Sequence, residues 1–195
     1  MERWVGTALE GTVVRLEPLS REHEECLWLA SRDERTWRWL SVVQPRTREE
    51  WSEWIAQALA AAAAGTEIPF TTISRDRIVG STRFLALRPE HRSLEIGWTW
   101  LHPSAWGTGA NVEAKLLQLE YAFGTLGCRR VELKTDALNE RARRAIEALG
   151  ATFEGIHRKH MLVRDGESRD SAWYSILDHE WPGARARLEQ RLAAG

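Results

Sequence analysis

Hydrophobic and polar residues alternate along several short runs of the chain, which is the pattern of strands with one buried face. Three of these runs follow one another closely in the middle of the sequence, as the strands of an antiparallel meander do. The last two bracket an Asp-Gly pair, which is typical of a hairpin turn. The predicted strands are Gly11–Pro18, Pro69–Arg75, Ile78–Leu87, Ser93–Leu101 and Arg130–Thr135, followed by a hairpin around Asp165–Gly166.

Helical spacing of apolar residues, with capping residues at the ends, predicts the segments between the strands. Thr47 and Glu50 have the spacing of a capping box, in which each side chain satisfies a free backbone amide. The predicted helices run from Ser20 to Ser31, Thr47 to Gly65, Asn111 to Phe123, Asn139 to Leu149, and from Pro182 onward. The element order predicts a mixed α/β (α+β) fold, with one mostly antiparallel sheet and helices on both faces. We expect one domain over residues 11–195 after an N-terminal tail of residues 1–10.

Charge and composition exclude several classes of function. The chain has 27 lysine and arginine residues against 28 aspartate and glutamate residues, so no basic excess points to nucleic acid or an anionic membrane. Its longest apolar run, Ala58–Ala64, is too short to span a bilayer. Cys26 and Cys128 are too few for a disulfide framework, and we expect a cytoplasmic protein. Eleven tryptophans exceed the needs of one core, which predicts that some line a pocket or a subunit contact.

A glycine-rich loop joins the predicted strand Ser93–Leu101 to the helix that follows it. Such a loop directs several backbone amides and the positive end of the helix dipole to one point, which predicts an anion site. A Walker loop is excluded because no lysine follows Gly107 or Gly109. A dinucleotide-binding fingerprint fits poorly because Val112 stands where its third glycine belongs. Asp136, near the end of the next strand, does match the acidic residue that binds the ribose in that motif.

The loop resembles the acyl-CoA loop of the GNAT N-acetyltransferases, whose pattern is Gln/Arg-x-x-Gly-x-Gly/Ala. Ser104 takes the first position of this pattern, and Gly107 and Gly109 take the glycine positions. Other segments match in the same order, namely Gly80–Arg83, Leu94–Gly97, Asn139–Ala151, Glu154–Gly155, Arg169–Asp170 and Glu180–Pro182. The ordered set is more specific than the loop alone. It is similar in particular to the branch that contains the Rim-type ribosomal-protein N-terminal acetyltransferases.

The resemblance implies acetyl-CoA as co-substrate, bound where the fourth and fifth strands of the fold splay apart. It implies that strand backbone contacts the pantetheine arm, that the loop holds the pyrophosphate, and that an asparagine contacts the arm from the far side. The implied residues are Trp98, Thr99, Trp100 and Leu101 on the strand, Trp106, Gly107, Thr108, Gly109, Ala110 and Asn111 in the loop, and Asn139. Two positions depart from the pattern: Ser104 replaces its glutamine or arginine, and Ala142 replaces a serine that is able to protonate the CoA thiolate.

Transfer of an acetyl group to an amine requires a base that takes the proton of an ammonium group. Because every second side chain of a strand points to the same face, we expect Glu95 and Thr99 on one face of their strand and Trp98 and Trp100 on the other. Glu95 is the first candidate for the base, acting through water. Its alternative role is structural, as a carboxylate held by Arg83 on the neighbouring strand.

Three further residues are weighed for proton transfer. His157 and His160, three apart in a strand, are expected to face opposite ways, which argues against a shared metal, and His160 is a second candidate base. Tyr174 is a candidate donor of the proton that Ala142 does not supply, or else a core aromatic residue. Asp136 at a strand end either meets an ammonium substrate or caps a turn.

We therefore predict an acetyl-CoA-dependent N-acetyltransferase that moves an acetyl group directly to a primary amine, either a protein N-terminus or a small molecule. We expect no metal, no nucleic acid and no membrane partner, and we expect a homodimer. The alternative is a non-catalytic acyl-CoA-binding or regulatory module, and a nicotinamide dinucleotide-binding protein comes third. The tryptophans expected to pack near the acceptor side, one or two of them lining its pocket, are Trp28, Trp37, Trp39, Trp51 and Trp54.

Overall fold

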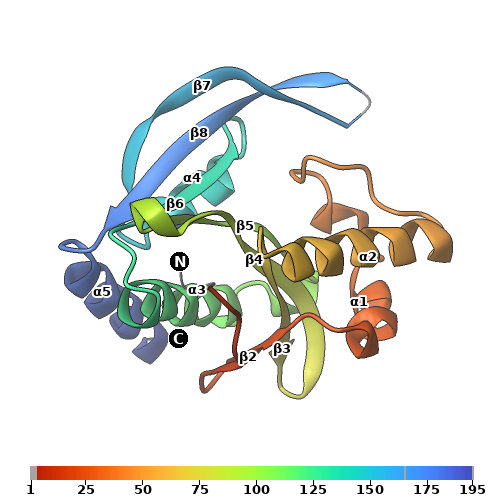
Figure 1. Ribbon diagram of the computed structural model, residues 1–195, viewed down its shortest axis with the longest axis horizontal. Helices are drawn as coiled ribbons and strands as arrows, with labels where there is room; N and C mark the ends of the chain where they lie inside the picture. The colour runs from red at the N-terminus through yellow and green to blue at the C-terminus, as the bar shows by residue number, and fades with distance from the viewer. Residues whose placement is uncertain (1–3, 165, 195) are drawn as a thin grey trace.

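The computed structural model describes residues 4–164 and 166–194, and within them one sheet of eight strands runs through the molecule (Figure 1). All neighbouring strands are antiparallel except β5 and β6, which are parallel. In spatial order the strands are β1 (Leu9–Glu10), β2 (Val14–Pro18), β3 (Ile68–Ser74), β4 (Arg77–Arg88), β5 (Ser93–Leu101), β6 (Arg130–Asp136), β8 (Glu167–Leu177) and β7 (Thr152–Val163). The predicted fold class is confirmed. β7 and β8 flank the predicted Asp165–Gly166 turn, of which Asp165 lies outside the described residues.

Helices pack on both faces of the sheet. They are α1 (Glu24–Ala30), α2 (Arg48–Ala64), α3 (Ala110–Glu120), α4 (Glu140–Glu147) and α5 (Trp181–Ala193). Adjacent residues of β4 show the two sides, because Thr82 hydrogen-bonds Lys115 of α3 whereas the Arg83 guanidinium lies over Trp54 of α2. No helix among the described residues is long and apolar enough to cross a membrane.

The helix ends follow the predicted capping chemistry. The Thr47 hydroxyl accepts a hydrogen bond from the amide of Glu50, and the Glu50 carboxylate accepts one from the amide of Thr47, which completes the capping box. Gly65 ends α2 with a φ of 74°, a left-handed conformation that glycine adopts without strain. Asn139 caps α4 by accepting the amide of Ala142 at 3.1 Å.

The first predicted strand is interrupted, because a carboxylate from α3 pins a turn at its start. Glu113 accepts the amides of Thr12, Val13 and Val14 at 2.9, 2.6 and 2.6 Å. A Cβ at Gly11 would lie 2.3 Å from a Glu113 oxygen, so a larger residue there would displace the Glu113 carboxylate from these amides. The last two residues of the predicted tail, Leu9–Glu10, form a short strand that pairs with β2.

We expect Glu113→Gln to lower the free energy of unfolding by about 2 kcal/mol, the contribution typical of hydrogen bonds to a charged group. Although burial acts to raise it, the bonds from Val14, Thr12 and Val13 hold the pKa of Glu113 below its usual value. The loss should therefore be full above the unfolded-state pKa of about 4.3 and should shrink as pH falls through the lower folded-state pKa. Denaturant titrations at several pH values measure it. Glu120→Gln on the exposed side of the same helix is the control, with a change below ~0.5 kcal/mol; equal losses in both variants would contradict the account.

A bulge in β5 changes which side chains share a face. Arg83 pairs with Gly97 and Ser81 with Trp100, so Trp98 and Thr99 together lie opposite the single residue Thr82. Trp98 has a φ of 49°, in the left-handed region. The predicted pairing of Glu95 with Thr99 on one face is wrong because the bulge adds a residue to the alternation. Thr99 bonds Lys115 of α3 at 2.8 Å, and Trp100 packs on the other side, against Trp51 of α2.

Six tryptophans form a second core beneath α1 and α2. Neighbouring rings have centroids 5.0 to 6.4 Å apart, and the innermost are almost completely buried. The set comprises Trp28, Trp37, Trp51, Trp54, Trp98 and Trp100. Packing of this core therefore accounts for most of the tryptophan surplus, including four of the five residues predicted near the acceptor side.

β5 and β6 part after their first four residues. Ser93–Ile96 pairs with Arg130–Leu133, and beyond Ile96 and Leu133 the two strands share no pairs. The far half of β5 stays bound to β4 as far as Leu101, whereas β6 stays bound to β8 as far as Asp136. Counted from β2, these are the fourth and fifth long strands, so the predicted splay is present. We call this parting the fork.

Candidate active site at the fork

The loop at the end of β5 has the geometry of an anion site. Gly107 and Gly109 have φ values of 74° and 81°, which β-branched residues do not adopt without strain. The backbone amides of Gly107, Thr108 and Gly109 donate no hydrogen bond to any described residue, and α3 begins directly afterwards at Ala110. Free amides and the positive end of a helix therefore meet at one place.

Ser104 and Trp106 stabilise the loop from within. The Ser104 hydroxyl lies 2.8 Å from Nδ1 of His102, so it is engaged locally. The Trp106 indole donates to the carbonyl of Leu101 at 2.9 Å, which ties the loop to the end of β5. The Arg141 guanidinium of α4 lies 4.4 Å from the Trp106 ring centroid, so a cation from the β6 side of the fork reaches the loop.

Asn139 and Ala142 lie across the fork from the loop, at the start of α4. The amide oxygen of Asn139 caps the helix, while its NH₂ group donates no hydrogen bond within the described part of the chain. That group is available for a ligand. Ala142 lies in the first turn and supplies no proton.

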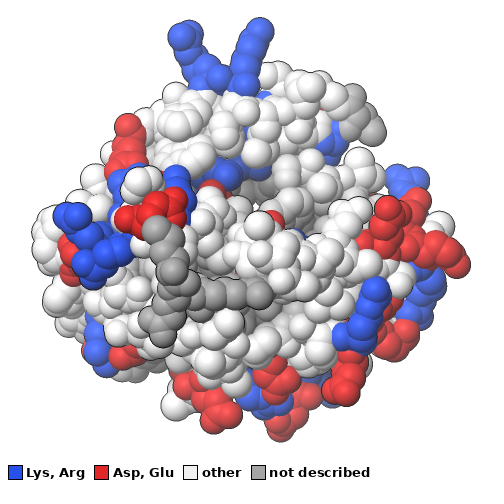
Figure 2. All heavy atoms as spheres, viewed as in Figure 1, with Lys and Arg blue, Asp and Glu red and all other residues white. Residues whose placement is uncertain are grey.

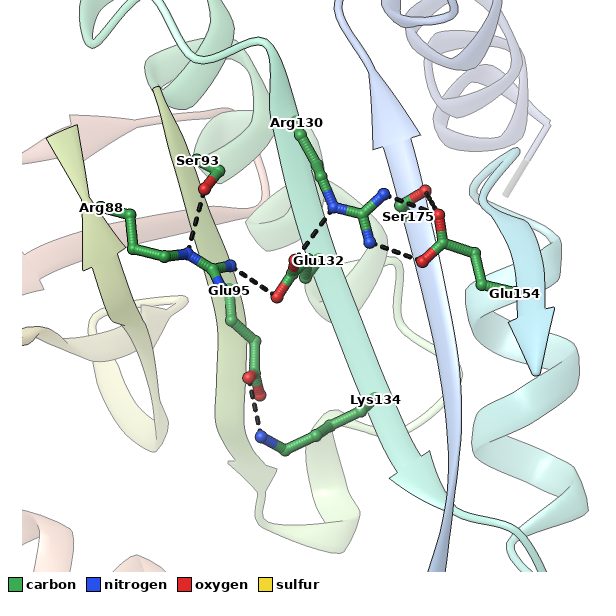
Figure 3. A network of polar contacts seen from close by, with 8 residues as sticks. All are labelled: Arg88, Ser93, Glu95, Arg130, Glu132, Lys134, Glu154 and Ser175. Atoms are coloured by element: carbon green, nitrogen blue, oxygen red, sulfur yellow. Dashed lines mark hydrogen bonds and ion pairs between the residues drawn. The ribbon is translucent and has the colours of Figure 1, made fainter. Parts of the chain in front are cut away.

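The carboxylate of Glu95 lies at the base of the fork and pairs with a residue that sequence reasoning missed. Its oxygen is 2.7 Å from Nζ of Lys134 on β6, and Glu95 is 3% exposed (Figure 3). Burial raises the pKa of Glu95, and Lys134 opposes this rise. The predicted structural partner, Arg83, is wrong: it pairs with Glu67 at 2.9 Å instead, because it lies opposite Gly97 in the sheet.

A line of ion pairs crosses the paired part of the strands on the same face (Figure 3). Glu132 joins Arg88 at 2.7 Å and Arg130 at 2.9 Å, and both oxygens of Glu154 bind Arg130. Arg130 holds the pKa of Glu154 below its usual value. Glu95 lies beside this line but pairs only with Lys134 among the described residues. Its second oxygen is therefore free to accept a hydrogen bond.

His160 lies on the same side of the sheet as Lys134. Its Nδ1 is 3.0 Å from the Ser171 hydroxyl, and its ring packs edge-on against Trp173, whose ring also lies under Nζ of Lys134. His157 stacks on the same indole, so the expectation that the two histidines face opposite ways is wrong. Three residues of β7 lie opposite one of β8 here, which breaks the alternation.

Burial, reinforced by Lys134, His157 and Arg169, lowers the pKa of His160, which makes its ring neutral over a wider pH range. A neutral imidazole is able to accept a proton. Within the described residues no group of three His, Cys, Asp or Glu side chains is arranged to hold a metal ion.

Tyr174 is not brought together with Glu95 and His160. It is fully buried on the opposite face of β8, where its hydroxyl accepts a hydrogen bond from Arg143 at 3.0 Å and donates one to Glu147 at 2.9 Å. Burial raises its pKa, although Arg143 acts to lower it. The hydroxyl is therefore engaged with α4, on the side of the sheet where Asn139 lies.

Lys134 and Trp173 are the residues that the sequence did not reveal. They lie directly opposite each other in the pairing of β6 with β8. The alternating pattern of each strand indicates that both face the side away from α3, but only the register between strands brings them beside Glu95. Asp136, the candidate contact for an ammonium group, lies at the end of β6 and accepts the amide of Leu138 at 2.9 Å.

A model of the acetyltransferase (GNAT) domain matches residues 14–152. The chain therefore belongs to this family, which confirms the resemblance seen in the sequence. Two relatives from Bacillus subtilis are an uncharacterized N-acetyltransferase, YoaA, 31% identical over 51% of this chain and 55% of that protein, and a putative ribosomal N-acetyltransferase, YdaF, 33% identical over 49% and 51%. The matched segment thus spans about half the length of these curated relatives.

Solved structures match over nearly the whole chain. A putative acetyltransferase from T. thermophilus is 39% identical, with 97% of this chain and 99% of that chain covered and a TM-score of 0.86. A GCN5-related N-acetyltransferase from Brucella melitensis is 34% identical, covering 98% and 86% with a TM-score of 0.89. RimJ of Mycobacterium smegmatis, solved in complex with CoA-disulfide, is 22% identical over 95% and 93% with a TM-score of 0.81, and it shares the fold.

We expect Gly109→Val to weaken acetyl-CoA binding at least ~10-fold, or about 1.4 kcal/mol, while the fold survives. Valine at a φ of 81° strains the turn that holds the amides of the loop in place. Calorimetric titration with acetyl-CoA measures the change. Gly183→Val in α5, where a Cβ meets nothing within 4 Å, is the matched control. A dissociation constant that is the same in both variants would remove the loop from the site.

Proposed function

We propose that the chain is an acetyl-CoA-dependent N-acetyltransferase that moves the acetyl group directly to a primary amine. One observation carries the proposal: the fork leaves Gly97–Leu101 of β5 without a partner on one side, and the anion-binding loop follows at its end. An extended thioester arm is able to pair with such an open strand edge as an added strand does. The pyrophosphate of the bound acetyl-CoA then lies at the free amides of Gly107, Thr108 and Gly109.

Direct transfer suits the cysteines of this chain. Cys128 is buried, and burial raises the pKa of its thiol to about 12, so it is not a thiolate at neutral pH. Cys26 is exposed on α1, outside the fork. An amine that attacks the thioester needs correct placement, a polarised carbonyl and a group that takes its proton.

Glu95 is the base that we propose, acting through a water molecule. It lies at the base of the fork, and burial raises its pKa toward the range in which a carboxylate accepts protons efficiently. Lys134 holds the carboxylate in place at 2.7 Å. His160 is the second candidate base, and Tyr174 is a candidate proton donor to the thiolate only if its bond to Glu147 opens.

The acceptor class follows less directly. Similar proteins include one named as a putative ribosomal N-acetyltransferase, and a protein N-terminus and a small amine both present the neutral amine that the chemistry needs. A non-catalytic acyl-CoA-binding module is the alternative function.

The cytoplasmic location and the homodimer stay predictions. The homodimer is supported by β7, which is an edge strand with Phe153 and Ile156 exposed at 45% and 39%.

We expect Glu95→Gln to lower turnover ~100-fold, because the amide keeps the shape but accepts no proton, while acetyl-CoA affinity changes little. Wild-type turnover should rise with pH through a pKa above the usual 4.5 of glutamate, since only the ionised carboxylate acts as base. The variant should lack that limb and rise only as the free amine becomes available. Thiol release with a panel of amines and peptides, measured from about pH 5 to about pH 10, checks both.

Glu132→Gln is the matched control, because Glu132 pairs directly with Glu95 across the sheet and is 8% exposed. It lies in the line of ion pairs with Arg88 and Arg130, so its loss should lower the melting temperature. Its charge also helps to raise the pKa of Glu95, so turnover per folded molecule is compared above that pH limb, where it should be unchanged. If Glu95→Gln behaves in the same way, Glu95 is structural. If no amine or peptide is acetylated by the wild-type chain, the non-catalytic alternative holds.

A further inference from the structure

One buried cation near the fork has no hydrogen-bond or ion-pair partner among the residues that the structure describes. Arg169 lies on β8 and is 8% exposed. Because alternate side chains of a strand share a face, it lies on the same face as Ser171 and Trp173. No hydrogen bond or ion pair joins its guanidinium to another residue of the described chain, and its Nε is buried without an acceptor. A buried N–H donor of a cation that has no acceptor is costly unless something binds the group.

The charged groups around Arg169 are engaged elsewhere. Burial lowers the pKa of Arg169, Asp136 and Glu95 oppose this, and Arg164 adds to it. Glu95 pairs with Lys134 at 2.7 Å, and Asp136 accepts the amide of Leu138 at 2.9 Å. These carboxylates are near enough to influence Arg169, but neither forms an ion pair with it.

The hairpin that carries Arg169 is tied to the connection between α1 and α2. The β7–β8 hairpin arches over the fork toward the connection between α1 and α2 (Figure 1), and Arg164 donates to the carbonyls of Arg38 and Leu40 at 3.0 and 2.9 Å. In the space-filling view the surface is hollowed between this upper lobe and the rest of the molecule, with charged atoms visible inside (Figure 2).

We propose that Arg169 binds a carboxylate of the acceptor, so that the substrate class is a primary amine that also carries a carboxylate. This rests on the proposed function, since it assigns the acceptor of that reaction. A guanidinium matches the planar carboxylate with two parallel hydrogen bonds. The nearby ammonium of Lys134 is already paired with Glu95 at 2.7 Å, whereas the Arg169 guanidinium has no ion pair among the described residues and is left to bind a carboxylate. Asp136, beside Arg169, suits the ammonium form of the same substrate.

The test uses acceptors in matched pairs that differ only by a carboxylate or a carboxamide. Small amino acids against their amides form one set, and peptides with glutamate or glutamine at the second position form the other, which separates the two sources of carboxylate. For at least one set, wild-type kcat/KM should favour the carboxylate at least ~10-fold, or about 1.4 kcal/mol. Arg169→Gln should bring that ratio near one, and Arg169→Lys should restore part of it. Arg158→Gln, an exposed arginine of β7, is the control and should leave the ratio unchanged.

A binding measurement separates the acceptor assignment from the reaction itself. The N-acetylated carboxylate and carboxamide products are titrated calorimetrically into enzyme saturated with CoA, which needs no turnover. Selective binding of the carboxylate without turnover on any acceptor would keep the role of Arg169 and refute the proposed reaction. Turnover with equal preference for both members of every pair would keep the reaction and overturn the role of Arg169. Equal or absent binding of both products by the wild-type chain also overturns it, whether or not the Arg169 variants fold.

Discussion

Everything at the candidate site depends on the point where β5 and β6 stop pairing. After Ile96 and Leu133 each strand keeps its outer neighbour and loses its inner one. An unpaired strand edge inside a protein is costly because its amides and carbonyls lack partners. We therefore propose the fork as the site of a ligand that brings its own donors and acceptors. The anion loop at one end and Glu95 at the base lie where they do because they flank this edge.

The bulge at Trp98 and Thr99 holds the far half of β5 in position. Close approach of β4 is possible because position 80 is glycine; a Cβ there would lie 2.0 Å from the Trp100 carbonyl oxygen. On the α3 side, Lys115 donates to Thr82, Thr99 and Gln118 at 3.1, 2.8 and 2.9 Å, and burial lowers its pKa to about 7. One buried lysine thus connects α3 to both strands of the bulge, using hydroxyl and amide acceptors in place of a carboxylate.

The two faces of the fork differ in chemistry. The face toward α3 and α4 carries neutral or internally satisfied polar groups, such as the Tyr174 hydroxyl between Arg143 and Glu147. The other face carries Glu95 with Lys134, and beyond them the cation of Arg169. Charge is therefore concentrated on the face where we propose that the amine acceptor binds, whereas backbone groups dominate where the thioester arm is proposed to lie. This division explains why the acyl-CoA pattern is readable in sequence and the acceptor site is not.

Local signals predicted the elements well, since a capping box at Thr47 and Glu50 or a glycine at position 65 acts within a few residues. Errors arose where an irregular strand broke the alternation, as at Trp98 in β5 and between His157 and Met161 in β7. Neither bulge has a glycine or proline at its centre to announce it. The partner of Glu95 was missed because Lys134 comes from a parallel strand 39 residues away, and only the register decides which side chains meet.

The most direct measurement of the proposed binding site is amide hydrogen exchange along β5 with and without CoA. The account predicts that exchange in Gly97–Leu101 slows at least ~10-fold when CoA pairs with the open edge, while Ser93–Ile96, already paired on both sides, changes little. Unchanged exchange in Gly97–Leu101 at saturating CoA would contradict the claim that the fork is the binding site.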